Sequence, residues 1–347
     1  MKAILIALAG LFVTSGCQSF KYYDPAKPHH GEKSFLNNYD NSEKQSFWKW
    51  QWERFIKDKP KEPEFEPEIL KTDSAFLKSN QSQNTFTWIG HATALLQAGG
   101  ANVLTDPVFS ERVSPVSFAG PSRVVKLPMQ MEDLPPIDAV VVSHGHYDHL
   151  DLPTLKELAK RNPQTLFLVP LGNAELLQGE GIKNVKELDW WENVTVKGLT
   201  ITFTPAQHWS ARSLFDRNQT LWGGWYVRSA NFSFLYTGDT GYSKDFLDIA
   251  EKLGAVDIAF IPIGAYEPRW FMKQQHVNPE EAVQIHLDVK AKLSIGGHWG
   301  TFRLSDEAMA APPQDLEKAL AHKNVKPSEF RVMKHGEILI YTPTSSK

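Results

Sequence analysis

Short apolar runs separated by polar and helical stretches dominate the chain from about residue 85 onward. Each run has the length of a strand and therefore predicts one. The runs are Thr85–Ile89, Ala94–Gln97, Ala101–Leu104, Ile137–Val142, Thr165–Val169, Thr200–Phe203, Phe232–Tyr236, Ile258–Ile261, Leu293–Ile295 and Ile338–Tyr341. A helix is predicted to begin after Asn278, because Pro279 and two glutamates follow and suit a first helical turn. This alternation is typical of an α/β layered fold.

The segment before these runs, residues 18–84, is polar and interrupted by prolines and charges, so we expect an arm and not a domain. Within it, four apolar side chains recur at helical spacing and predict a short amphipathic helix: Trp48, Trp52, Phe55 and Ile56. Its aromatic rings either pack on the main domain, which is the favoured interpretation, or enter lipid headgroups. Residues 85–343 then form one large domain.

The first 17 residues predict a signal peptide, because Lys2 precedes an apolar run too short to span a bilayer. The run ends in Val13-Thr14-Ser15-Gly16-Cys17, which resembles the bacterial lipobox, so Cys17 would carry a lipid anchor. The alternative is an ordinary signal peptide cut at about the same place. Gln18, in place of an aspartate after the cysteine, favours an outer-membrane address facing the periplasm. The membrane of a bacterial cell envelope is therefore an expected partner.

Composition sets only wide limits on the function. The 347 residues include 37 Lys and Arg against 40 Asp and Glu, a formal net charge of -3. So even a balance argues against a nucleic-acid partner, whose phosphates need a basic surface. Cys17 is the only cysteine, so no disulfide forms within the chain and stability must come from core burial. The sequence indicates no oligomeric state.

Side chains that bind metals crowd into the segment that follows Ile137–Val142, which reads Ser143-His144-Gly145-His146-Tyr147-Asp148-His149. In extended backbone His144 and His146 project to the same side, so two imidazoles can converge on one ion. Past the turn, Asp148 and His149 are free to face a second ion. A pair of adjacent ions accounts for this density better than one ion or a polar surface loop.

Three more residues of this kind follow other apolar runs: His208, Asp239 and His298. Each residue alone is weak evidence for a metal site. A histidine after a strand is often a hydrogen-bonded loop residue, and the Gly-Asp-Thr-Gly around Asp239 could be a turn. All seven candidates stand at the carboxyl ends of predicted strands, where open α/β folds gather functional residues. This common placement predicts one site.

The order His-x-His-x-Asp-His, His, Asp, His is similar to that of the metallo-β-lactamase superfamily. This resemblance implies a four-layer αβ/βα sandwich with a binuclear metal site. Longer words between Trp88 and Glu337 look like N-acylphosphatidylethanolamine-hydrolysing phospholipase D. These words are Trp88-Ile89-Gly90-His91-Ala92-Thr93, Leu104-Thr105-Asp106-Pro107, Glu187-Leu188-Asp189-Trp190-Trp191, Gln207-His208-Trp209 and Ile261-Pro262-Ile263-Gly264-Ala265-Tyr266-Glu267-Pro268-Arg269-Trp270-Phe271-Met272.

The resemblance also implies a ligand set and a reaction. Carried over by position, the ligands are His144, His146 and His208 for one ion, Asp148, His149 and His298 for the other, and Asp239 as a bridge. Such ligands suit two Zn²⁺ per chain, although iron, manganese or nickel remain possible. The ions would activate water against a phosphodiester. A phospholipid substrate, N-acylphosphatidylethanolamine, would yield phosphatidic acid and an N-acylethanolamine.

Residues near the expected ligands are predicted to have supporting, catalytic or substrate-binding roles. Asp106 either accepts a hydrogen bond from a ligating imidazole or caps Pro107. His276 resembles a histidine beside the metals that would bind phosphate or protonate the leaving alkoxide, and the alternative is a structural role. Together with Asp148, these two are the predicted catalytic residues, and His91 is expected to support the site through a hydrogen bond. The predicted substrate-binding residues are Tyr266, Trp270, Gln275 and His276.

Three hypotheses therefore follow from the sequence. The first is a dimetal phospholipase D acting on N-acylphosphatidylethanolamine. The second keeps the fold and the metals but acts on another ester or phosphodiester of the envelope. The third is a non-catalytic envelope lipoprotein in which the metals are structural, and the complete ligand set argues against it.

Overall fold

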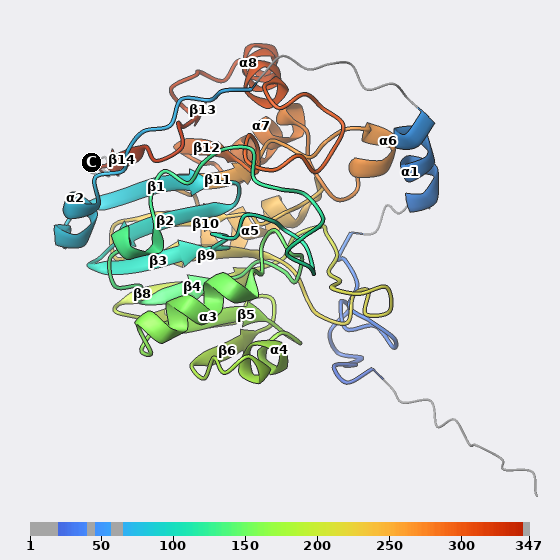
Figure 1. The fold of residues 1–347 in the computed structure, drawn as a ribbon, viewed down its shortest axis with the longest axis horizontal. Coiled ribbons are helices and arrows are strands. Elements are labelled where there is room, and N and C mark those ends of the chain that lie inside the picture. The colour runs from blue at the N-terminus through green and yellow to red at the C-terminus, as the bar shows by residue number, and fades with distance from the viewer. Residues whose placement is uncertain (1–19, 40–45, 57–64, 343–347) are drawn as a thin grey trace, which may run out of the picture.

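The computed structural model describes residues 20–39, 46–56 and 65–342, and its centre is a pair of stacked mixed sheets (Figure 1). The first sheet has the order β14 (Ile338–Tyr341), β1 (Asn84–Gly90), β2 (Thr93–Ala98), β3 (Ala101–Thr105), β4 (Ala139–Val141), β5 (Leu166–Pro170), β6 (Val185–Leu188). The second has the order β13 (Phe330–Val332), β12 (Leu293–Gly297), β11 (Ile258–Pro262), β10 (Ser233–Tyr236), β9 (Gly224–Arg228), β8 (Leu199–Thr204), β7 (Asn193–Val196).

Helices cover the outer face of each sheet. On the first sheet these are α2 (Ser74–Ser79), α3 (Leu152–Arg161) and α4 (Ala174–Gly179), and on the second α5 (Asp245–Leu253), α7 (Pro279–Asp288) and α8 (Ala311–Lys323). Two more helices, α1 (Phe47–Ile56) and α6 (Arg269–Met272), lie together at one edge of the molecule, and a short 3-10 turn spans Met131–Asp133. The predicted four-layer αβ/βα sandwich is confirmed.

Three apolar layers hold the sandwich together. The inner one lies between the sheets and is rich in fully buried aromatic rings such as Phe86, Trp225 and Phe234. A second lies between the second sheet and its helices, and a third between the first sheet and its helices. Strands with both faces buried need continuous apolar sequence, which is why they appeared as uninterrupted hydrophobic runs.

Parallel strands position the functional edge. β3, β4, β5 and β6 pair in parallel in the first sheet, and β10, β11, β12 and β13 do so in the second. Their carboxyl ends therefore lie at one edge of each sheet, and in the sandwich these edges adjoin. Loops that leave these strands meet there.

The ten predicted strands are all present, whereas β6, β7, β9 and β13 were not predicted. The reason is local: β6 reads Val-Lys-Glu-Leu, β7 and β13 are short, and β9 begins at a glycine. Their partners in the sheet supply the hydrogen bonds that fix them as strands. The capping box at Asn278 begins α7 as predicted, with the side chain of Asn278 accepting from the backbone N–H of Glu281.

The predicted amphipathic helix exists as α1, Phe47–Ile56. Trp50, not a member of the predicted apolar stripe, makes the contact with the domain: its ring stacks on Phe271 with centroids 4.7 Å apart, and its Nε1 donates to Asp306. Trp52 and Ile56 of the predicted stripe are 63% and 57% exposed. The described contact of α1 with the main domain is therefore made by Trp50, a residue outside the predicted stripe.

The signal peptide and Cys17 lie outside the described residues. Among the residues that the structure does describe, no helix combines the length and the apolar character needed to cross a membrane. The arm residues 20–39 pack on the domain beside the loop that follows β8, and α2 buries Leu77 completely against the first sheet.

Candidate metal centre

The loop after β4 carries the densest part of the site. It turns sharply at Gly145, whose N–H donates to Ser210 Oγ at 3.1 Å, and a Cβ there would lie only 2.8 Å from that oxygen. Arg212 holds the loop from outside, because its Nη1 donates to the carbonyls of Gly145 and Leu150 at 2.7 and 2.9 Å. The loop is thus fixed by contacts far away in sequence, and its histidines are turned inward.

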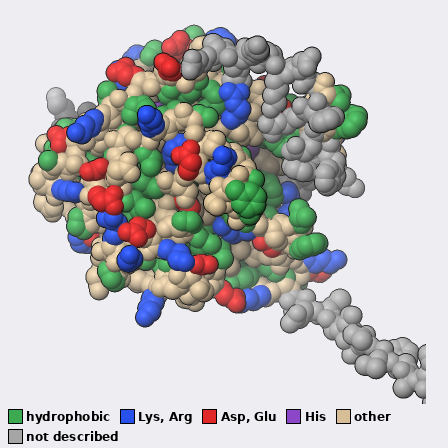
Figure 2. All heavy atoms as spheres, viewed as in Figure 1, with side chains coloured by type: hydrophobic (Ala, Val, Ile, Leu, Met, Phe, Trp, Pro, Cys, Tyr) green, Lys and Arg blue, Asp and Glu red, His purple; other side chains and the backbone are tan. Residues whose placement is uncertain are grey.

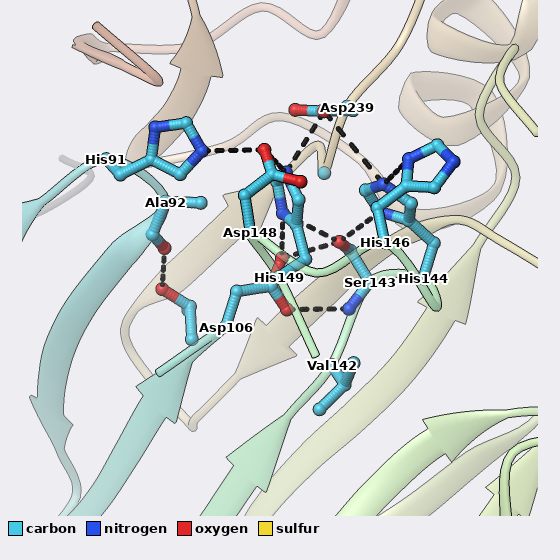
Figure 3. Close-up of polar contacts among 12 residues, drawn as sticks. His91, Ala92, Asp106, Val142, Ser143, His144, His146, Asp148, His149 and Asp239 are labelled. Atoms are coloured by element: carbon cyan, nitrogen blue, oxygen red, sulfur yellow. Dashed lines mark hydrogen bonds and ion pairs between the residues drawn. The ribbon is translucent and has the colours of Figure 1, made fainter. Parts of the chain in front are cut away.

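Three other strand ends deliver the remaining side chains. His208 follows β8, Asp239 follows β10, and His298 follows β12. The turn before Asp239 needs a glycine at position 238, where φ is +65°. A Cβ atom at Gly238 would lie only 2.5 Å from the carbonyl oxygen of Gly223. His298 itself adopts φ 56°, an uncommon left-handed conformation that orients its ring. The structure thus brings all three to the loop after β4 (Figure 3 draws Asp239 there).

One group of side chains consists of His144, His146 and His208. His144 Nε2 lies 2.7 Å from His146 Nδ1, and His208 Nε2 lies 3.4 Å from the same nitrogen. All three residues are largely buried. His208 is oriented by a hydrogen bond from its Nδ1 to the Gln275 carbonyl at 2.9 Å, which leaves Nε2 for the centre.

The other group consists of Asp148, His149 and His298. Asp148 Oδ2 lies 3.2 Å from His149 Nε2 and 3.4 Å from His298 Nε2, and these two nitrogens are 3.2 Å apart. Asp239 lies between the groups. Its Oδ2 is 3.0 and 3.2 Å from the same two nitrogens and 4.0 Å from the Nε2 atoms of His144 and His208.

The donor set fits two metal ions. Two ligands of one tetrahedral zinc, each about 2.0–2.1 Å from it, lie roughly 3.3 Å apart. The separations within the second group, 3.2 to 3.4 Å, match this value. Imidazole nitrogens also face one another, His144 Nε2 and His146 Nδ1 at 2.7 Å and His149 Nε2 and His298 Nε2 at 3.2 Å. A cation between such atoms would resolve the conflict.

The first group is electrostatically ready to bind metal. Burial lowers the pKa of His144 and of His208 well below the ordinary value, and lowers that of His146 to about 4. Mutual repulsion between neighbouring imidazoles adds to this effect. The rings are therefore neutral near pH 7, and the neutral ring is the form that coordinates a metal.

The second group is dominated by its carboxylates. Burial opposes the charged form of His149 and His298, but Asp239 and Asp148 outweigh it, so the pKa of His149 lies well above its ordinary value and that of His298 rises to about 9. Burial also opposes the charge on Asp148 and Asp239, yet the adjacent imidazoles hold both pKa values well below the usual range. Two charged carboxylates thus face the centre.

Asp106 supports the ligands from behind. Its Oδ2 accepts from His149 Nδ1 at 2.6 Å and from Ser143 Oγ at 2.5 Å, and Oδ1 accepts from the Ser143 N–H at 2.7 Å (Figure 3). Oδ2 also accepts from the Tyr236 hydroxyl at 2.5 Å. These bonds fix the tautomer of His149, so that its Nε2 faces the centre. The carboxylate makes the hydrogen bond that the sequence predicted.

Two further histidines adjoin the centre. His276 Nδ1 lies 3.9 Å from Asp239 Oδ2 and has no hydrogen-bond partner, although it is buried. Burial lowers the pKa of His276 to about 4. His91 lies on the far side, where its Nε2 makes a 2.9 Å hydrogen bond with Asp148 (Figure 3), as expected of a supporting residue.

The predicted substrate-binding residues differ in their placement. Tyr266 is buried, and its hydroxyl donates to Asp315 of α8 at 2.6 Å. Trp270 is 39% exposed. Gln275 presents its backbone carbonyl to His208. Contact of these residues with a substrate stays a prediction.

Sequence reasoning missed several supporting residues. Ser143 and Tyr236 bond to Asp106, and a signal existed for both, because each directly adjoins a recognised ligand segment. Arg212 and Asn37 contact ligand-bearing backbone from a loop and from the arm, and no local pattern marks them. His335, to which the sequence assigned no role, is buried at 1% exposure, with its ring centroid 4.2 Å from that of Trp88.

Comparison with known proteins agrees with this geometry. The sequence profile of the "Beta-lactamase superfamily domain" matches residues 101–299. The chain is 46% identical over 264 residues to N-acyl-phosphatidylethanolamine-hydrolyzing phospholipase D 1 of Caenorhabditis elegans. This alignment covers 73% of this chain and 74% of that protein. The chain is 39% identical over 238 residues to the mitochondrial N-acyl-phosphatidylethanolamine-hydrolyzing phospholipase D of Saccharomyces cerevisiae, covering 67% and 50%.

Solved structures share the fold at low sequence identity. A possible metal-dependent hydrolase from Veillonella parvula superposes with a TM-score of 0.60 at 20% identity, covering 75% of this chain and 100% of that one. An isothiocyanate hydrolase from Delia radicum gut bacteria superposes with a TM-score of 0.59 at 21% identity, and the superposition covers 75% of this chain and 100% of that one. The chain belongs to the metallo-β-lactamase superfamily of metal-dependent hydrolases, and within it to the family of the N-acylphosphatidylethanolamine-hydrolysing phospholipases D.

Proposed function

We propose that the protein hydrolyses N-acylphosphatidylethanolamine to phosphatidic acid and an N-acylethanolamine with two zinc ions. The observation that carries the proposal is the pair of ligand groups that share Asp239, in a chain 46% identical over 264 residues to a relative named for this reaction. His144, His146 and His208 would hold one ion, and Asp148, His149 and His298 the other. When bound, the ions would activate water for attack on phosphorus and offset the charge of the phosphodiester.

The chain itself would orient the reactants. Asp106 would keep His149 in one tautomer and orientation throughout the reaction. His276, whose buried Nδ1 has no partner, would donate a hydrogen bond to a phosphate oxygen or to the departing ethanolamine oxygen. His91 would restrain Asp148 and so prevent this carboxylate from rotating away from its ion.

An apolar rim near the centre supports a lipid substrate. Leu214 and Phe215, in the loop after β8, are each 93% exposed, and Phe118, in the loop after β3, is 83% exposed. Both loops lie on the same side of the molecule, and Figure 2 shows hydrophobic side chains gathered there. Between them lies a cavity of about 790 Å³, lined by Val116 of one loop, by Tyr147 of the loop after β4, and by charged residues that include Arg112, Arg212 and Asp216. Acyl chains could enter there from a bilayer.

Hydrolysis in ¹⁸O-labelled water tests the substrate and shows which bond is cleaved. Purified protein with two metal ions per chain is given N-acylphosphatidylethanolamine in H₂¹⁸O, and the products are analysed by mass spectrometry. Attack on phosphorus places ¹⁸O in phosphatidic acid, whereas cleavage of the carbon–oxygen bond would label the N-acylethanolamine. No turnover by the dimetal protein would reject the substrate, and a His146→Ala variant is the inactive control.

The two rival functions separate in the same assay. A panel of envelope esters and phosphodiesters, compared by kcat/KM, would identify a different hydrolase if one of them exceeds N-acylphosphatidylethanolamine. A non-catalytic lipoprotein would turn over none of them. It would also keep its biological activity in a His146→Ala variant that still folds.

We further propose that Cys17 anchors the mature protein by lipid to the bacterial outer membrane, facing the periplasm. Two acyl chains anchor stably where one does not, so the enzyme would stay at the surface that holds its substrate. In cells fed radioactive palmitate, the wild-type protein should be labelled and a Cys17→Ala variant should not. Equal labelling of both, or recovery of the wild type in the soluble periplasmic fraction, would contradict the anchor.

A further inference from the structure

The arm, residues 20–39, is attached to the domain by several contacts, and two of them are with Asp189 and with His208. At the first, the buried carboxylate of Asp189 accepts from Lys27, His29 and His30 at 2.6, 2.7 and 3.0 Å. At the second, Asn37 contacts the strand end that carries His208. The family profile covers residues 101–299, so the arm lies outside it. The second attachment nevertheless reaches the metal centre.

Asn37 pairs with the backbone of His208 as a neighbouring strand would. Its Nδ2 donates to the His208 carbonyl at 3.1 Å, and its Oδ1 accepts from the His208 N–H at 3.1 Å. The same Oδ1 accepts from Nε1 of the fully buried Trp222 at 2.9 Å, which fixes the orientation of the amide. Among the described residues, these are the hydrogen bonds found for the backbone of His208.

The contact of Asn37 with the backbone of His208 adds to a second, separate hydrogen bond that holds the ring of His208. Gln275 accepts from Nδ1, and Nε2 lies 3.4 Å from His146 Nδ1 and 4.0 Å from Asp239 Oδ2. A ligand must stay within about 0.5 Å of its productive position. With the ring fixed at Nδ1 and the backbone fixed by Asn37, the side chain between them has little freedom to leave that position.

We propose that Asn37 is a positioning residue of the metal centre, through which the arm holds His208 against its ion. The inference rests on the proposed function only in taking His208 as a ligand. A purely structural anchor would affect stability and leave metal binding unchanged. Asn38 offers the matched control, because it donates to Asp245 Oδ1 at 2.8 Å and, among its described contacts, touches no proposed ligand.

The test compares Asn37→Ala with Asn38→Ala in the full-length protein. Zinc affinity is measured by competition with a chromogenic chelator, and the absorption spectrum is recorded after loading with Co²⁺. Loss of such supporting partners weakens metal binding about 10- to 100-fold. We expect a loss of this size for one of the two ions in Asn37→Ala, with an altered Co²⁺ spectrum, and wild-type values in Asn38→Ala. Wild-type affinity and spectrum in Asn37→Ala would overturn the proposal.

A second variant guards against loss of folding. Asn37→Asp keeps the size and the Oδ1 acceptor but removes the Nδ2 donor and places a carboxylate against the His208 carbonyl. It should fold, as judged by thermal unfolding, and still bind one ion more weakly than the wild type does. Unchanged metal affinity would again overturn the proposal. Because the readout is metal affinity, failure to hydrolyse N-acylphosphatidylethanolamine would reject the proposed substrate and leave this result standing.

Discussion

Single side chains behind the ligands control the chemistry as much as the ligands do. Asp106 is completely buried and accepts four hydrogen bonds, one of them from His149. These four donors satisfy both oxygens of a carboxylate that is removed from water. It therefore fixes both the tautomer and the direction of a proposed zinc ligand.

Replacement of Asp106 by asparagine should weaken metal binding. The amide keeps one acceptor, but its NH₂ group must face donors, so His149 loses its orientation. We expect roughly a 10- to 100-fold loss of affinity for one ion, measured by zinc titration. Asp257→Asn is the control, because Asp257 is a buried carboxylate bonded to Ser233 at the other end of β10. Equal zinc affinity in the two variants would contradict this role of Asp106.

At the scale of elements, loops and the arm add properties that the sandwich alone does not have. The loop after β8 both holds the ligand loop, through Arg212, and exposes Leu214 and Phe215. The arm is fixed through an ionic group around Asp189. The ammonium of Lys27 already pairs with the Asp189 carboxylate at 2.6 Å, so we interpret this group as an anchor and not as a metal site.

Replacing the exposed side chains of Leu214 and Phe215 should weaken binding to membranes and leave turnover of soluble substrates unchanged. Burying Leu214 and Phe215 in lipid contributes about 1.5–3 kcal/mol each at most. In Leu214→Ser/Phe215→Ser we expect at least tenfold weaker sedimentation with phospholipid vesicles and unchanged turnover of a short-chain soluble substrate. Leu287→Ser, at a 43% exposed position on α7, is the control. Unchanged vesicle binding would exclude these loops from the membrane contact.

The anchor at Asp189 should make stability depend on acidity. Burial opposes its charge, but hydrogen bonds from His29 and Lys27 outweigh this effect and hold the pKa of Asp189 well below its usual value. The stabilisation is therefore fully present above about pH 4, the ordinary aspartate pKa, and is lost as the pH falls toward the lowered pKa. Asp189→Asn should cost about 2 kcal/mol at pH 7 and less at pH 3, measured by urea unfolding. An equal cost at both pH values would contradict this.

At the scale of the whole molecule, the metals should join the two halves of the sandwich. Ligands come from β4 of the first sheet and from the ends of β8, β10 and β12 of the second. Ions bound to both sets would connect sheets that otherwise meet through apolar packing and through hydrogen bonds such as that from Trp225 Nε1 to the Val142 carbonyl. A ligand that binds the folded state alone stabilises it in proportion to the logarithm of its concentration over Kd.

Chelation should therefore lower the midpoint of thermal unfolding as well as the activity. At a zinc concentration of 100 Kd, each ion contributes about 2.7 kcal/mol. We expect re-addition of two Zn²⁺ per chain to restore both properties, and Mg²⁺ to restore neither, because imidazole ligands disfavour it. Metal content, activity and unfolding are measured on the same samples. A metal-free protein with the wild-type midpoint would show that the ions do not join the sheets.

The sequence by itself determined the layered fold, the ten apolar strands and the ligand-type residues at their ends. These features are local, because burial on both faces demands continuous apolar runs and metal binding demands particular side chains. The tertiary structure alone decided that Trp50 of α1 packs on the domain, how β9 pairs within its sheet, and that Arg212 and Asn37 support the centre. Those contacts join residues distant in sequence, and only the packed chain brings them within hydrogen-bonding distance.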